Sequence, residues 1–174
     1  MKPMEATEVT VPARAAVEQL VACGVTHVVW LPDSESGFMY EALTQAEADG
    51  RLKLVPICRE GESIPLAFGL LLGGKRPAIL IQNTGFFEAG DSLRGQAIDL
   101  HLPLVLLIGY RGWRPDRADM TDSAGVYLEP VLDAWGVPHY LIDQPSKLPR
   151  IREAFDEAER REGPVAVLIA GEWE

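Results

Sequence analysis

The feature of this sequence that most constrains its fold is the regular alternation of short apolar runs with segments of helical periodicity. The apolar runs are rich in β-branched residues and almost unbroken, which is typical of strands covered on both faces in a parallel sheet. We expect strands at 26–31, 52–56, 77–82, 102–109, 138–142 and 164–170. We expect helices at 12–23, 37–49, 62–73, 88–100, 123–135 and 146–161.

This alternation, with right-handed crossovers, predicts an α/β fold. The expected architecture is a doubly wound, mainly parallel six-stranded sheet with helices on both faces, in a flavodoxin-like layering. The 174 residues contain no repeat, low-complexity tract or linker, so we expect a single domain over 1–174. The longest irregular stretch, 109–122, is expected to be a mobile or partner-contacting loop.

Composition excludes several classes of function. The net charge of −10 argues against a nucleic-acid surface, which needs clustered Lys and Arg. No apolar run reaches membrane-spanning length, and the first residues lack the basic start and apolar middle of a signal peptide. Cys23 and Cys58 have no metal-like spacing and are interpreted as small hydrophobes in a reducing compartment. We therefore predict a cytoplasmic protein with no nucleic-acid or membrane partner.

Ligands of doubly wound sheets collect at the carboxyl ends of the strands. Polar and glycine residues concentrate in the four loops expected there, 32–36, 58–62, 82–87 and 109–113, whereas the turns from helix to strand look ordinary. The chain has no G-x-G-x-x-G after a strand, no P-loop and no G-x-S-x-G elbow. His27, His101 and His139 lie in or beside apolar runs, and we expect them to pack or cap rather than bind a ligand.

Three segments carry a family resemblance: "LPDS" at 31–34, "REGESIPLAFGLLLGGKRPAILIQNTG" at 59–85 and "LPLVLLIGYRG" at 102–112. Together they resemble the pyrimidine-binding (Pyr) domain of thiamine-diphosphate enzymes. More narrowly, the chain is similar to the α subunit of sulfopyruvate decarboxylase and the N-terminal domain of phosphonopyruvate decarboxylase. The resemblance covers about residues 10–170, essentially the whole chain.

The resemblance implies a catalytic role for Glu60, whose spacing to Gly69 matches the family's helix start. In that family one carboxylate exchanges a proton with N1′ of the cofactor's aminopyrimidine, and the cofactor then serves as an electron sink for loss of CO2 from a 2-oxo acid. Glu62 falls in the first helical turn, where an acid is favoured by the helix dipole.

The resemblance also implies roles for the P-D-S loop and for the loop after the third strand. Asp33 and Ser34 match positions that face the substrate and handle protons, although Pro-Asp-Ser is equally good turn chemistry. Gln82, Asn83 and Thr84 match the loop near the pyrimidine and the substrate. For Asn83, beside a glycine, a turn role competes with this one.

Arg111 closes a predicted strand at the same edge of the sheet. Its guanidinium suits a multi-oxygen anion such as a sulfonate or phosphonate, and we consider it as a substrate-binding residue. The competing interpretation is a solvated surface arginine.

Thiamine-diphosphate enzymes hold the diphosphate and Mg2+ through a G-D-G motif followed by an asparagine. This chain has only "GDS" at 90–92 and no asparagine after Asn83, so we predict no metal site in it. The hypothesis is a split enzyme, in which a separate β subunit with a diphosphate-binding (PP) domain holds diphosphate and Mg2+, and the Pyr domain also self-associates. The favoured activity is decarboxylation of a small 2-oxo acid resembling sulfopyruvate or phosphonopyruvate. The alternatives are a carboligating subunit resembling acetolactate synthase and a non-catalytic assembly module with this fold.

Overall fold

The core of this protein is a sheet of six parallel strands in the order β2-β1-β3-β4-β6-β5. In the computed structural model, residues 10–171 and 173 are described. The strands are β1 (His27–Trp30), β2 (Lys53–Pro56), β3 (Pro77–Gln82), β4 (Val105–Gly109), β5 (His139–Ile142) and β6 (Val165–Ile169). The predicted doubly wound α/β fold is confirmed.

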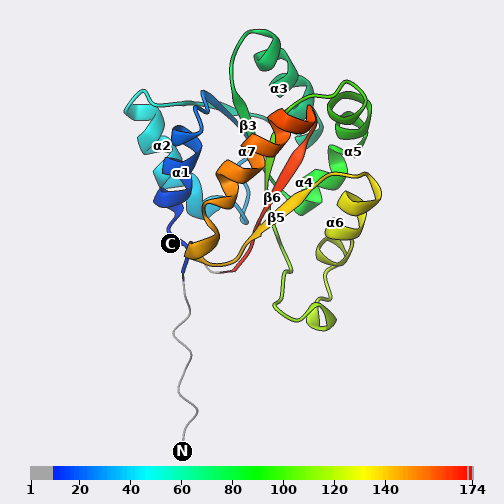
Figure 1. Cartoon of the computed structure of the whole chain (residues 1–174). Coiled ribbons are helices and arrows are strands. Elements are labelled where there is room, and N and C mark those ends of the chain that lie inside the picture. The colour runs from blue at the N-terminus through cyan, green and yellow to red at the C-terminus, as the bar shows by residue number, and fades with distance from the viewer. Residues whose placement is uncertain (1–9, 172, 174) are drawn as a thin grey trace, which may run out of the picture.

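Helices cover both faces of the sheet (Figure 1). The α-helices are α1 (Ala13–Ala22), α2 (Tyr40–Ala48), α3 (Ser63–Leu72), α4 (Asn83–Glu88), α5 (Gly90–Ser92), α6 (Ser123–Ala134) and α7 (Arg150–Arg161). Short helical turns precede or extend them: η1 (Gly37–Met39), η2 (Glu60–Glu62), η4 (Arg117–Asp119) and η5 (Pro145–Lys147), with a π-helical segment η3 (Leu93–Ile98).

Two apolar cores lie on opposite faces of the sheet. Helices α1, α2 and α7 pack on one face, and α3, α4, η3 and α6 pack on the other. Along β4, Val105 and Leu107 join the first core, while Leu106 and Ile108 join the second. Both faces are therefore apolar because both are buried, which explains why the strands are almost unbroken apolar runs in the sequence.

The strand order reverses between β1 and β3. From β1 the chain crosses to β2 on one side, and β3 then pairs with β1 on the other side. Such a switch point is where doubly wound sheets bind ligands, outside the carboxyl ends of the strands. The segments that follow β1, β2, β3 and β4 all lie at this edge, at the bottom of Figure 1.

The structure corrects the prediction for 82–87. These residues are not a loop followed by a helix at 88–100, because α4 begins at Asn83, directly after β3. Asn83 Oδ1 accepts a hydrogen bond from the Thr84 N–H at 3.1 Å, and Phe86 is completely buried in the second core. Asn, Thr and Gly favour turns locally, and the burial of Phe86 outweighs that preference. The fourth strand is also shorter than predicted, since it begins at Val105.

Helix α3 is unusual because its outer surface is apolar. Of its ten residues only Ser63, Ile64 and Ala67 are buried, while Leu66 is 36% and Leu72 is 76% exposed. No helix within the described residues is long and apolar enough to cross a membrane.

Candidate functional site at the carboxyl edge

Glu60 lies in the turn η2, between the end of β2 and the start of α3. Its side chain is partly buried, and residues 10–171 and 173 provide no hydrogen bond or ion pair to its carboxylate. The side chain lies directly against Gly85, where an added Cβ would be 2.3 Å from Glu60 Cγ and 2.7 Å from Oε1. Only glycine leaves room for the Glu60 side chain at this position.

A second acid, Glu88, holds the backbone that carries Glu60. Glu88 Oε1 accepts a hydrogen bond from Arg59 Nη2 at 2.6 Å, and Oε2 accepts the N–H of Gly61 in a very short contact. Arg59, through its hydrogen bond and charge, lowers the pKa of Glu88 and keeps it ionised. The residues on both sides of Glu60 are thus fixed to α4, while the Glu60 carboxylate has no hydrogen-bond or ion-pair partner in the part of the chain that the structure describes. Sequence analysis missed Glu88, because it lies 28 residues beyond Glu60 without a local pattern.

Other unpartnered oxygens lie at the ends of neighbouring strands. Asp33 follows β1, and its Oδ1 accepts the N–H groups of Glu35 and Ser36, both at 2.8 Å. Asp33 Oδ2 is buried without a hydrogen-bond partner within the described chain, as are Gln82 Oε1 at the end of β3 and Ser63 Oγ beside Glu60. Buried polar atoms are normally satisfied, so several unsatisfied atoms at one edge indicate a place for a ligand.

Asp33 therefore makes the turn that its sequence allows and still leaves one oxygen unused. Ser34 beside it is exposed. The two interpretations of the P-D-S loop, turn and site, are compatible in this geometry.

Asn83 has a different position from the one expected of a ligand contact. Its side chain is completely buried, and Nδ2 donates to the carbonyl of Arg111 at 2.9 Å. It thereby joins the end of β3 to the segment after β4. Thr84 is partly buried in the first turn of α4. We interpret Asn83 as a residue that positions this edge.

The side chain of Arg111 is half-exposed and forms an ion pair with Asp122, with Nε 3.1 Å from Oδ2. Asp122 also caps α6, because its Oδ1 accepts the N–H of Ala124 at 2.9 Å. Arg111 is thus a surface residue tied to the start of α6, and it does not line the large cavity described below.

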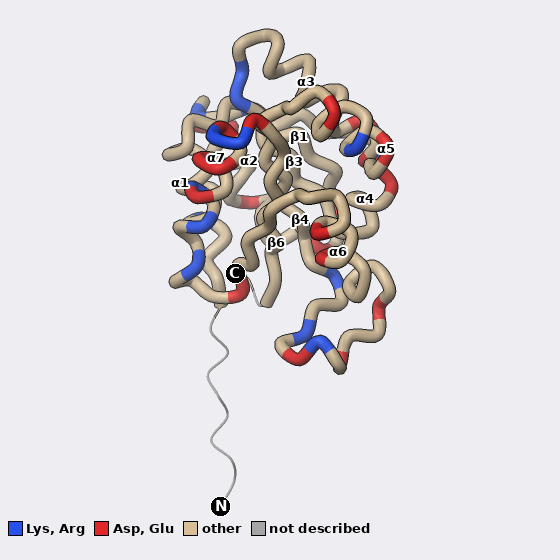
Figure 2. The backbone as a smooth tube through the Cα atoms, turned by 45° about the vertical axis from the view of Figure 1, so that its right-hand side comes forward, with Lys and Arg blue, Asp and Glu red and all other residues tan. Residues whose placement is uncertain are grey.

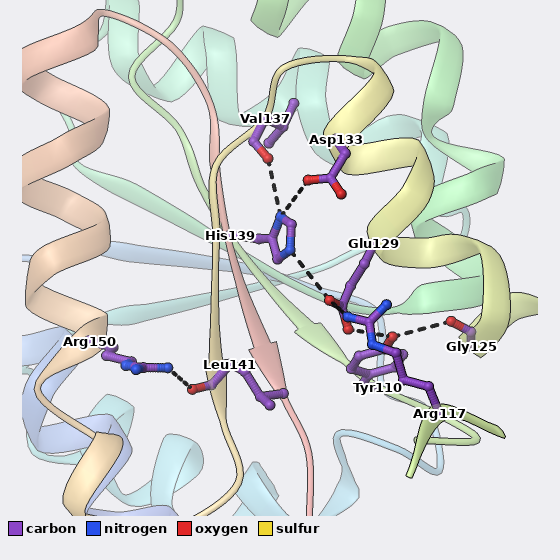
Figure 3. A network of polar contacts seen from close by, with 9 residues as sticks. All are labelled: Tyr110, Arg117, Gly125, Glu129, Asp133, Val137, His139, Leu141 and Arg150. Atoms are coloured by element: carbon purple, nitrogen blue, oxygen red, sulfur yellow. Dashed lines mark hydrogen bonds and ion pairs between the residues drawn. The ribbon is translucent and has the colours of Figure 1, made fainter. Parts of the chain in front are cut away.

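A polar network holds the segment 110–122 against α6 (Figure 3). The hydroxyl of Tyr110 donates to Glu129 Oε1 at 2.8 Å and lies 3.2 Å from the Gly125 carbonyl. Burial raises the pKa of Tyr110, so the phenol stays protonated and donates. Glu129 also binds the guanidinium of Arg117, and His139 Nε2 lies 3.6 Å from Glu129 Oε2. The segment therefore has an anchor within this chain.

A cavity of about 580 Å3 opens at the same edge, beside the ends of β4 and β6. Its lining residues are Ser34, Glu35, Phe38, Tyr110, Gly112, Trp113, Arg114, Pro115, Asp143, Ile169, Ala170, Gly171 and Trp173. Ser34 links it to the P-D-S loop, whereas Glu60 does not border it. Arg114, which sequence analysis missed, is the cation on its wall, and its Nη1 donates to the Trp113 carbonyl at 2.9 Å. Asp143, another lining residue, forms an ion pair with Lys147, whose Nζ lies 2.6 Å from Asp143 Oδ1.

The donor set of this edge fits an aminopyrimidine better than a metal. Within the described ranges, no group of three or more His, Cys, Asp or Glu side chains is arranged to hold a metal ion. A heteroaromatic ring with an amino group, in contrast, needs a carboxyl that exchanges protons and oxygens that accept hydrogen bonds. The edge carries oxygens of this kind in the carboxylate of Glu60 and in Gln82 Oε1, and the latter has no hydrogen-bond partner among the described residues.

Comparison with known proteins agrees with this geometry. No protein-family model matches the chain. The α subunit of sulfopyruvate decarboxylase from Methanococcus maripaludis is 24% identical over 164 residues, which are 93% of this chain and 96% of that subunit. The corresponding subunit from Methanocaldococcus jannaschii is 28% identical over 130 residues, 74% of this chain and 77% of that one.

Two other similarities cover only part of longer proteins. The 2-succinyl-5-enolpyruvyl-6-hydroxy-3-cyclohexene-1-carboxylate synthase of Rhodococcus erythropolis is 40% identical over 104 residues, 59% of this chain but 19% of that enzyme. Among solved structures, benzoylformate decarboxylase from Polynucleobacter necessarius superposes with a TM-score of 0.73 at 19% identity, over 90% of this chain and 29% of that one.

The fold and the relatives confirm that this chain resembles the pyrimidine-binding domain of thiamine-diphosphate enzymes. Within that class, its similarity extends over most of the length of the sulfopyruvate decarboxylase α subunits. The resemblance expected from 31–34, 59–85 and 102–112 is therefore confirmed.

Proposed function

We propose that this chain is the pyrimidine-binding subunit of a two-chain, thiamine-diphosphate-dependent 2-oxo acid decarboxylase. The substrate class is a small 2-oxo acid with a second acidic group, such as sulfopyruvate or phosphonopyruvate. The near full-length similarity to sulfopyruvate decarboxylase α subunits supports the activity. The observation that carries the proposal is the partly buried, unpartnered carboxylate of Glu60 in the space that Gly85 leaves for it.

In this proposal the carboxyl of Glu60 exchanges a proton with N1′ of the aminopyrimidine. Gln82 Oε1 would accept a hydrogen bond from the ring's amino group, and Thr84 lies in the adjoining helical turn. Glu88 and Asn83 keep these groups in place from α4. When bound, thiamine diphosphate supplies the electron sink that takes up the charge left by CO2.

The substrate side of the site would be formed by the loops after β1 and β4. In this proposal Asp33 Oδ2, which lacks a hydrogen-bond partner among the described residues, and the Ser34 hydroxyl would hold or move a proton near the reacting carbon. Arg111 is also proposed to bind the sulfonate or phosphonate, and to do so it would have to give up its ion pair with Asp122. Arg114 needs no such exchange, since no carboxylate of the described residues pairs with it, and a guanidinium matches a multi-oxygen anion.

The similarity to α subunits implies a partner subunit. We propose that this partner is a β subunit with a PP domain, which binds the diphosphate and Mg2+. The apolar outer surface of α3, with Leu66 and Leu72, supports contact with other chains, including a second copy of this one. The thiols of Cys23 and Cys58 are free, which supports a cytoplasmic setting.

The test is reconstitution. This chain is mixed with the candidate β chain, sought as the product of a neighbouring reading frame that carries G-D-G and a downstream asparagine. Sulfopyruvate, thiamine diphosphate and Mg2+ are supplied, and CO2 and aldehyde are measured. Turnover is expected only with both chains, and robust turnover by this chain alone contradicts the split.

A second candidate is a carbon–carbon bond-forming enzyme. It is favoured by the 40% identity to a synthase over 104 residues. This identity is higher than the 24% to a decarboxylase α subunit, although the latter extends over 164 residues. The same reconstituted pair distinguishes the two, because a decarboxylase releases an aldehyde whereas a carboligating enzyme releases a longer hydroxy-keto acid.

A further inference from the structure

The opposite edge of the sheet, formed by the amino ends of the strands, carries a second polar cluster. In the parallel register, His27 at the start of β1 pairs with Lys53 at the start of β2 and with Pro77 at the start of β3. Lys75 lies two residues before Pro77. Strand register therefore places a lysine on either side of His27.

These side chains line a cavity of about 530 Å3, in the size range of small-molecule sites. Its lining residues are Thr26, His27, Glu47, Gly50, Arg51, Leu52, Lys53 and Lys75. A smaller cavity of about 360 Å3 shares Thr26 and Lys75 with it. The loop between α3 and β3, whose sequence includes Lys75 and Arg76, has a blue stretch in Figure 2, at the end of the molecule away from the β4–α6 segment.

The lysines of this cavity have no counter-ion among the residues that the structure describes. Arg51 is paired with Glu18 at 2.6 Å and lies 3.8 Å from Asp49, whereas neither Lys53 nor Lys75 pairs with a carboxylate there. Glu47 is the acid on the cavity wall, and its Oε1 already accepts the N–H of Leu54 at 2.8 Å. Both lysines are exposed, so an anion from the solvent can reach their charges.

The position and the pKa of His27 are both suited to binding an anion. Its Nδ1 lies 2.9 Å from Thr26 Oγ1, and that oxygen also accepts the N–H of Arg76 at 2.9 Å. This arrangement fixes the imidazole and leaves Nε2 without a partner in residues 10–171 and 173. Burial, followed by the charges of Lys53 and Lys75, lowers the pKa of His27. An anion between the lysines would reverse the effect of those charges.

We propose that this amino-edge cavity binds a small molecule with a tetrahedral, multi-oxygen anionic group, a phosphate or a sulfonate. Lys53 and Lys75 provide the opposite charge, and the His27 imidazole provides a hydrogen bond that strengthens on protonation. The site is separate from Glu60 and does not depend on the decarboxylase assignment, because the two lie at opposite edges of the sheet.

The test uses the full chain, inorganic phosphate as the probe and sodium chloride to keep the ionic strength constant. Binding is followed by calorimetry and by the NMR titration of the His27 ring, assigned with the His27→Gln variant. Saturable binding is expected, together with a higher His27 pKa in phosphate. The double variant Lys53→Gln/Lys75→Gln is expected to bind at least about tenfold more weakly, as for loss of charged hydrogen bonds.

Lys147→Gln is the matched control, since Lys147 is paired with Asp143 at the other edge and its loss should leave phosphate binding unchanged. A parallel titration with sulfate separates general tetrahedral-anion binding from a phosphate preference, and either result supports the site. The proposal is overturned if binding is not saturable, if the double variant binds as the wild type does, or if the His27 pKa does not change. Thermal unfolding of each variant verifies that it is folded.

Discussion

The two edges of the sheet differ in how they hold unpaired polar groups. At the amino edge, strand register brings His27, Lys53 and the residues before Pro77 together, because they lie at the starts of neighbouring strands, and Thr26 also holds the His27 ring. At the carboxyl edge, Glu60 depends on a second layer of contacts, in which Glu88 fixes the adjacent backbone and Gly85 leaves the space. Among the described residues, the groups without a partner are the cations Lys53 and Lys75 at the first edge, and mainly oxygen acceptors, together with Arg114, at the second.

This difference indicates at which edge the side chains must be held in exact positions. A charged cavity that attracts an anion tolerates some freedom in its lysines, since Coulomb attraction is not strongly directional. Proton exchange with a ring atom needs hydrogen-bond geometry, so its carboxylate must be held by neighbouring residues. We therefore expect substitutions around Glu60 to affect rate strongly and substitutions around Lys53 to affect binding moderately.

The largest effect is expected for Glu60→Gln in the reconstituted enzyme. The amide cannot exchange the proton, so kcat should fall by about 10²- to 10⁴-fold with assembly intact. Assembly is measured by size-exclusion chromatography and rate by CO2 release. Glu62→Gln is the matched control, because Glu62 is an exposed acid in the same turn. If Glu60→Gln has the same rate as the wild type, Glu60 is not catalytic, and the chain is better described as a non-catalytic assembly module.

The next largest effect is expected for Gly85→Ala. The new methyl would overlap Glu60 Cγ at 2.3 Å and displace the carboxylate, which should lower kcat by roughly 10²-fold, as for small misplacements of catalytic groups. Gly95→Ala is the control, because a Cβ there meets nothing within 4 Å. If both variants keep full activity, the contact between Glu60 and Gly85 has no role in positioning.

A smaller effect is expected for Glu88→Gln. Arg59 lowers the pKa of Glu88 below its ordinary value of 4.5. The folded state then binds a proton at Glu88 less readily than the unfolded chain does. The interaction with Arg59 therefore stabilises the folded state above about pH 4.5, and this stabilisation is lost as the pH falls through the folded-state pKa of Glu88. Between pH 7 and pH 3.5, the Tm of Glu88→Gln should therefore fall less than the Tm of the wild type. Equal falls would show that the ion pair contributes nothing to folding.

The smallest effect is expected at the amino edge. Because the pKa of His27 is lowered from 6.5, the unfolded chain binds its proton more readily, and stability is lost as pH falls below that ordinary value. Phosphate in the cavity should reduce this loss. The Tm measured at pH 7.5 and 5.5, with and without phosphate, checks this in the wild type and in His27→Gln. The variant should lose the part of the pH dependence that His27 causes, and its remaining response to phosphate should be smaller, because Lys53 and Lys75 are retained. A wild-type Tm that is independent of phosphate at both pH values contradicts the comparison of the two edges.

Much of the fold could be predicted because the central strands β3, β4 and β6 are apolar runs buried on both faces, so that even a short segment such as 77–82 is distinct. The candidate site could be predicted in outline, since the carboxyl ends of parallel strands bring Asp33, Glu60 and Gln82 to one edge. Their specific roles, and that of Arg111, stay predictions.

The remaining features depend on contacts between distant segments. The helical start at Asn83 follows from the burial of Phe86, which a turn-like sequence does not reveal. Glu88 accepts a hydrogen bond from the N–H of Gly61, and these two residues are 27 positions apart in the sequence. The cluster of His27, Lys53 and Lys75 looked like ordinary helix-to-strand turns in the sequence, because only the register brings them together.

The hydrogen bond from Asn83 to the carbonyl of Arg111 has a consequence for how such a site can change during evolution. The acceptor is a main-chain atom, so the residue at position 111 can be replaced without loss of this anchor. A library that varies Arg111, Trp113, Arg114 and Pro115 while keeping Asn83, Gly112 and Arg117 would change the wall of the cavity and leave the scaffold beneath it intact.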